Sequence, residues 1–79
     1  MDTDDNYWKR VAAGVRAELA RQRKPTLDLV PLLGLNRNAV YRRVRGEIPF
    51  DLAQIQTVAD YLGVTVASFT ESTAPREVA

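Results

Sequence analysis

The apolar residues of the chain fall into short stretches with a helical period, each bounded by residues that begin or end helices. The first stretch runs from about residue 6 to Arg23, with a polar residue among 4–6 as its N-cap. Its apolar stripe consists of Trp8, Val11, Ala12, Val15 and Leu19. This spacing predicts a helix that buries Trp8 in the core, preceded by a flexible N-terminus at residues 1–5.

The next stretch is shorter and contains an awkward proline. Lys24-Pro25 ends the first helix, and Thr26 is placed to cap a second helix that reaches Leu33 and ends at Gly34. The expected core face consists of Leu27, Val30 and Leu33, with Leu29 as a further candidate. Because Pro31 lacks an amide that a helix interior would use, the second helix is short, kinked or begins later than Thr26.

Residues 36–45 form a helix with unusually clear boundaries. Asn36 is a good N-cap, Leu35 and Val40 have the spacing of a hydrophobic staple, and Gly46 supplies the left-handed residue that ends a helix. At 100° per residue, Val40 and Val44 face one way. The opposite face carries Asn38, Arg42 and Arg45, with Tyr41 on the flank between the two faces.

The C-terminal part of the chain predicts two further helices. Asp51 and Gln54 have the spacing of a capping box before a helix that ends at Gly63. Its apolar stripe consists of Leu52, Ile55, Val58, Ala59 and Leu62. Thr65 caps a last short helix, in which Phe69 either completes the core, the favoured interpretation, or packs on a partner. Residues 71–79 lack periodicity and are expected to be a flexible tail.

These elements predict an all-α protein, a compact bundle of about five short helices in one domain spanning residues 6–70. The net charge of +1 conceals a strong asymmetry along the chain. Residues 1–8 carry −3, residues 9–46 carry +8 and residues 47–79 carry −4. A solvated charged surface is one interpretation, but the basic segment coincides with the helix at 36–45, which favours a phosphate-facing surface.

The composition argues against several functional classes. The chain has no Cys and no His, so zinc sites, disulfides, thiol nucleophiles and imidazole bases are excluded. The acidic residues are dispersed, and we expect neither an enzyme nor a cofactor or metal site. There is no apolar run long enough to cross a membrane, and the acidic N-terminus is unlike a signal peptide. We therefore expect a cytoplasmic protein that is nucleoid-associated when bound to DNA.

The stretch from Thr26 to Phe69 resembles the Cro/CI-like helix-turn-helix domain, also called Xre-type or lambda repressor-like. The resemblance rests on Leu33-Gly34, Asn36, Gly46, Pro49 and Leu62-Gly63-Val64. It implies a central helix-turn-helix whose helix at 36–45 enters the major groove of double-stranded DNA. The implied function is a sequence-specific transcriptional regulator, most often a repressor of phage or mobile-element type.

A second resemblance, over Thr26 to Pro49, is to excisionase-type winged-helix DNA binders, with an architectural role as a further alternative. Those proteins would continue into a β-hairpin wing, whereas this chain continues into a capped helical pattern, which favours the Xre-type interpretation.

The candidate site residues divide into two groups by the chemistry of DNA. Arginine and asparagine can make paired hydrogen bonds to guanine and adenine, and recognition helices read mainly with their N-terminal turns. The expected base contacts are Arg37, Asn38, Tyr41 and Arg42. The expected phosphate contacts are Lys24, Thr26, Arg43 and Arg45.

One recognition helix reads few base pairs, so we expect a homodimer on DNA, formed through Val64, Val66 and Phe69; a monomer on asymmetric sites is the alternative. A protein-interaction role of antitoxin type would need spaced apolar anchors in residues 70–79, where only Val78 stands.

Overall fold

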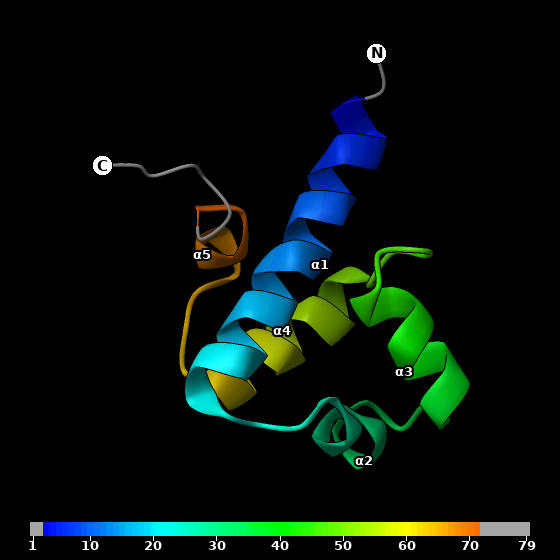
Figure 1. Cartoon of the computed structure of the whole chain (residues 1–79). Helices are drawn as coiled ribbons and strands as arrows, with labels where there is room; N and C mark the ends of the chain where they lie inside the picture. Colours follow the sequence, from blue (N-terminus) through cyan, green and yellow to red (C-terminus); the bar gives the residue numbers. More distant parts are fainter. Residues whose placement is uncertain (1–2, 72–79) are drawn as a thin grey trace.

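The computed structural model describes residues 3–71, which form five α-helices and one short 3-10 helix (Figure 1). In chain order these elements are α1 (Thr3–Gln22), η1 (Thr26–Asp28), α2 (Leu29–Leu33), α3 (Arg37–Val44), α4 (Leu52–Leu62) and α5 (Val66–Glu71). No strand occurs within the described residues, so the predicted all-α class is confirmed. The expected tail, residues 71–79, lies outside the described residues except for Glu71, which ends α5.

The first helix is longer than the sequence pattern predicted. It begins at Thr3 and not near residue 6, and its first turn therefore includes Asp4 and Asp5. Acidic residues are favourable in a first helical turn because they lie at the positive end of the helix dipole. The predicted start of the first helix is therefore about three residues too late, and the flexibility expected of residues 1–5 stays a prediction. Residues 1–2 lie outside the described part of the chain.

One apolar core joins all five α-helices. Its buried members are Val11, Val15, Leu19, Leu29, Val40, Val44, Ile55, Val58, Ala59, Leu62 and Phe69. The favoured interpretation of Phe69 as a core residue is confirmed, since its side chain is almost completely buried. Trp8, by contrast, is only half-buried and is not part of this cluster, so its prediction as a core residue is wrong.

The segment expected to form a single second helix is split in two. Residues 26–28 form a 3-10 turn whose N-cap is Pro25, with no side-chain cap, so the predicted capping role of Thr26 is wrong. Pro31 is the third residue of α2, where its missing amide costs little because the first turn of a helix leaves amides unpaired. Leu27 is 44% exposed, so its prediction as a core residue is wrong, whereas the further candidate Leu29 is completely buried.

The predicted helix boundaries at α3, α4 and α5 are confirmed by hydrogen bonds. The side chain of Asn36 accepts from the Ala39 amide at 2.8 Å. Asp51 and Gln54 form the complete capping box, and the Ser68 amide donates to the Thr65 hydroxyl. The segment after α3 leads into α4 and not into a β-hairpin, so the structure does not support the winged-helix alternative.

The contacts between the helices place α3 at the edge of the molecule. α1 contacts α3, α4 and α5, whereas α2 packs against η1, α3 and α4. Figure 1 shows α3 on the opposite side of α1 from α5. This arrangement leaves one side of α3 available to a partner.

Candidate nucleic-acid interface

Hydrogen bonds hold both ends of α3, and the helix has the buried face and the exposed face that the sequence predicted. Val40 and Val44 are buried, while Arg37, Asn38, Arg42 and Arg45 are exposed. Tyr41 is half-buried on the flank. The outward face of α3 is therefore a rigidly held array of hydrogen-bond donors.

A Schellman motif ends α3. Gly46 has φ +83°, its amide donates to the Arg43 carbonyl, and the Glu47 amide donates to the Arg42 carbonyl at 2.9 Å. Arg16, from the middle of α1, donates to the carbonyl of Val44 at 2.8 Å. A guanidinium at this end also complements the negative end of the helix dipole, so α1 holds α3 directly.

The carboxylate of Glu47 lies between two arginines of the outward face. Its Oε2 accepts from Arg45 Nε at 2.8 Å, and its Oε1 lies 3.6 Å from Arg42 Nε. The hydrogen bond from Arg45 holds the pKa of Glu47 below its usual value, and the same bond raises the pKa of Arg45. The basic face of α3 thus carries its own counter-charge.

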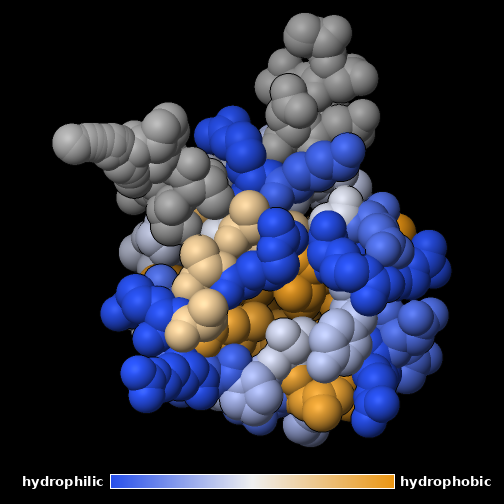
Figure 2. Space-filling model, viewed as in Figure 1, coloured by the Kyte–Doolittle hydropathy of each residue, from blue (hydrophilic) through white to orange (hydrophobic). Residues whose placement is uncertain are grey.

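A groove with a volume of about 400 Å³ runs between α1, the segment before η1, and α3. Its lining residues are Arg16, Leu19, Ala20, Lys24, Pro25, Thr26, Tyr41, Val44 and Arg45. Figure 2 shows a hollow with an apolar floor on the face of the molecule that Figure 1 presents, surrounded by hydrophilic side chains. The structure therefore brings four predicted contact residues, Lys24, Thr26, Tyr41 and Arg45, around one groove.

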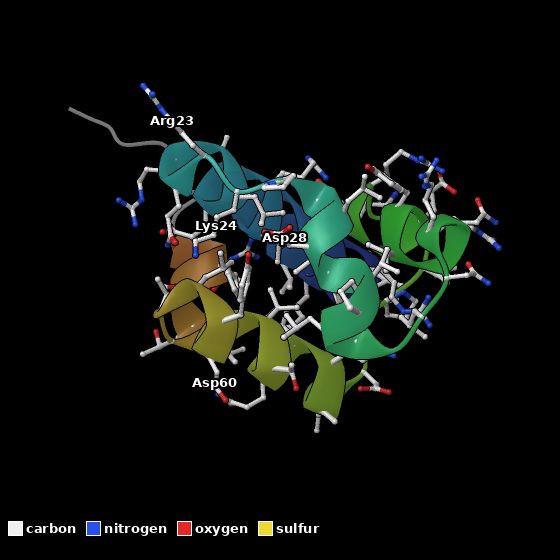
Figure 3. All side chains as sticks on the ribbon, turned by 90° about the horizontal axis from the view of Figure 1, so that it is seen from below. Arg23, Lys24, Asp28 and Asp60 are labelled. Carbon is white, nitrogen blue, oxygen red and sulfur yellow. The ribbon has the colours of Figure 1, made fainter. Side chains whose placement is uncertain are left out.

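Lys24 and Asp28 converge on Tyr61 of α4. The Lys24 ammonium lies 4.5 Å from the centre of the Tyr61 ring, and the Tyr61 hydroxyl donates to Asp28 Oδ2 at 2.5 Å. In Figure 3, Lys24 and Asp28 lie toward the middle of the molecule while Arg23 points away from it. Lys24 is therefore anchored at its tip, so a phosphate would have to compete with the Tyr61 ring for it.

Arg43 lies apart from the groove, between α3 and α4. Its Nε donates to Gln54 Oε1 at 3.1 Å, and one terminal nitrogen donates to the Ala39 carbonyl at 3.0 Å. Because Gln54 also belongs to the capping box of α4, Arg43 connects α3 to the start of that helix. Its role as a phosphate contact stays a prediction, as do the roles of the other seven candidate residues.

Comparison with known families decides the classification. The model of the BetR domain family matches residues 3–77, which is nearly the whole chain. The chain belongs to the BetR domain family. No curated protein and no solved structure matches it. The family is one of small helical domains of DNA-binding type, which supports a DNA-binding regulatory domain; the narrower Cro/CI-like assignment is not confirmed.

Two residues that contact α3 in this BetR domain, Arg16 and Glu47, were not predicted from the sequence. Arg16 was one of several arginines on the first helix, and nothing in its spacing distinguished it. Glu47 lies in the short segment between the two helices predicted at 36–45 and before Gly63, and its charge is opposite to that of the candidate residues. Both act through tertiary or turn contacts, for which the local pattern carries no signal. The only available hint for Glu47 was its position directly after the glycine that ends the helix.

Two findings concern other classes of site in the BetR domain. Among the described residues, no group of acidic side chains is arranged to hold a metal ion. No helix within that part of the chain has the length and apolar character needed to cross a membrane.

Proposed function

We propose that this BetR domain is a sequence-specific transcriptional regulator that binds double-stranded DNA with α3 in the major groove. The observation that carries the proposal is the outward face of α3, where Asn38, Arg42 and Arg45 are exposed on a helix fixed at both ends. A helix held in this way presents its side-chain donors to base edges with little loss of backbone freedom on binding. The +8 charge of residues 9–46 supplies the attraction to phosphate.

The candidate residues have distinct roles in this proposal. Arg37, Asn38 and Arg42 contact base edges from the first two turns of α3, with Tyr41 beside them toward the groove. Lys24, Thr26, Arg43 and Arg45 contact phosphates and fix the register of the helix. Because the groove brings Lys24, Thr26 and Arg45 together, one strand of the DNA backbone would pass along it.

We further propose that binding represses transcription by occupying an operator, and that two copies bind neighbouring half-sites. Phe69 cannot form the dimer contact that the sequence suggested, because it is buried in the core. The apolar surface available to a second copy is a groove lined by Tyr7, Trp8, Val11, Phe50, Leu52, Ile55 and Val66. Leu52 is 86% exposed and Tyr7 is 51% exposed, and both line this one groove, so they form a contiguous apolar surface of the kind that partners cover.

Binding of the purified protein to a randomised duplex library, followed by sequencing of the selected sites, tests this proposal. Enrichment of one short motif, with a mirrored copy about one helical turn away, is the expected result. Enrichment of a single unpaired motif would support a sequence-specific regulator but would indicate that it binds as a monomer and not as a dimer. No enrichment, with only steeply salt-dependent binding, would favour an architectural role, and no binding at all would favour a protein-interaction role of antitoxin type.

A further inference from the structure

The Glu47 carboxylate lies beside the Nε atoms of two arginines at the end of α3. Arg45 donates a hydrogen bond to this carboxylate from its Nε atom, and the Nε atom of Arg42 lies within ion-pair distance of it, at 3.6 Å. Within the described residues, no hydrogen bond joins the terminal nitrogens of these two side chains to another group. A guanidinium held at Nε still has its two terminal nitrogens available for a paired hydrogen bond.

The backbone fixes the position of this carboxylate. Glu47 follows Gly46 directly, and its own amide donates to the Arg42 carbonyl at 2.9 Å as part of the Schellman motif. The residue therefore sits at a defined place beside the last turn of α3. Its side chain is about half exposed, so the pair contributes little to folding stability. The contact with Glu47 instead affects which groups Arg42 and Arg45 can bind.

We propose that Glu47 is a positioning residue that orients Arg42 toward base edges and Arg45 toward one phosphate of the preferred site, while it weakens the binding of both arginines to phosphates elsewhere. This inference rests on the proposed function. The hydrogen bond at Nε restricts the rotamers of Arg45, and the same carboxylate attracts Arg42 to its other oxygen. Less side-chain freedom is therefore lost when Arg42 meets guanine acceptors and Arg45 meets its phosphate. The same carboxylate repels phosphate groups that approach the two guanidinium groups. Glu47 thereby strengthens binding to a preferred site and weakens sequence-independent binding.

These two effects have opposite signs when Glu47 is changed. Glu47→Gln removes the charge, so affinity for random-sequence duplex should rise about threefold to tenfold at low salt, with a steeper dependence on salt. Affinity for the selected site should fall about threefold to tenfold, because Arg42 and Arg45 lose their orientation. A purely electrostatic role would instead strengthen both kinds of binding.

Glu47→Asp separates charge from position, because the shorter side chain keeps the negative charge but cannot reach both Nε atoms. Binding of this variant to random duplex should stay close to that of the wild type, while binding to the selected site falls. Asp60→Asn is the matched charge control. Asp60 is exposed on α4, its side chain accepts from Gln56, and Figure 3 shows it far from α3.

The experiment measures the affinity of the full chain and each variant for the selected site and for a random-sequence duplex across a range of salt. Nitrogen-15 NMR of the arginine Nε–H groups checks the contact itself, since Glu47→Gln should shift the Arg45 signal without any DNA. Opposite changes in the two affinities support the inference. Equal changes in the same direction, or none, overturn it while leaving the proposed function intact. A wild-type protein without any preferred sequence overturns both.

Discussion

Gly14 in α1 lies directly against the main chain of Phe69 in α5. A Cβ added at Gly14 would overlap the carbonyl group of Phe69 and lie 2.6 Å from its Cα atom. α5 packs mainly on α1, and the buried ring of Phe69 lies in the core. The absence of a side chain at one position of α1 therefore determines how closely the last helix approaches.

Gly14→Ala should destabilise the protein, although alanine is the better helix former by about 1 kcal/mol. Main-chain atoms cannot move aside as a flexible side chain can, so α5 must shift away from α1, at a cost of about 1–3 kcal/mol. Urea unfolding of the variant measures the change. Ala17→Gly, at an exposed position of the same helix, is the control for helix propensity. If Gly14→Ala made the protein more stable than the wild type, α5 would not pack this closely.

Arg16 should affect DNA binding without touching a base. Its hydrogen bond to Val44 ties α1 to the end of α3, and loss of a bond of this kind costs about 1 kcal/mol. Arg16→Met should therefore lower the free energy of unfolding modestly and weaken binding to the selected site. Arg10→Met removes the same charge from an exposed position of α1 and is the matched control. Equal effects of the two substitutions on both measurements would mean that Arg16 acts only through its charge.

The hydrogen bond between Tyr61 and Asp28 predicts that the stability of the fold decreases at high pH. The hydrogen bond to the carboxylate raises the pKa of the Tyr61 hydroxyl above its unfolded value of about 10. Its contribution to stability is therefore present below about pH 10 and is lost as pH rises through the folded-state pKa. In Asp28→Asn, the tyrosinate absorbance of the folded protein should develop at lower pH. Tyr61→Phe identifies the transition that belongs to this residue, and an unchanged titration in Asp28→Asn would contradict the contact.

The proposed dimer depends on the exposed residue Leu52. Leu52→Ser should leave the fold intact, because the side chain is 86% exposed, and should weaken self-association. Sedimentation of both proteins over a range of concentrations measures this effect. Leu27→Ser is the control, since Leu27 is also a large exposed apolar residue but does not line the same groove. A wild-type protein that stays monomeric on its selected DNA site would contradict the dimer.

Local sequence signals were sufficient where an element is defined by its own neighbours. Asn36, Asp51 and Thr65 cap helices as predicted, and the inward valines of α3 are buried. Each of these features depends on residues within one or two turns, and such residues are visible in the sequence.

The signals failed where the outcome depends on tertiary packing. Leu52 fits the period of the stripe in α4, but it is the first residue of that helix and projects beyond the neighbouring elements. Arg23 adopts the left-handed conformation, with φ +58°, where glycine or asparagine is usual. Arg43 is turned toward Gln54, a contact between two helices. The candidate site was therefore predicted on the outer face of α3 but not in its connections to α1, α4 and the turn at Glu47.

The most direct test of α3 as the recognition helix compares the DNA sequences selected by the wild type with those selected by Arg42→Ala and Lys24→Ala. If α3 reads base edges, Arg42→Ala should lose the preference at one or two adjacent positions and bind the original site about 1–3 kcal/mol more weakly. Lys24→Ala should weaken binding to all sequences alike and reduce the salt dependence. Selection of the same motif with the same affinity by the wild type and Arg42→Ala would contradict the assignment of α3 as the recognition helix.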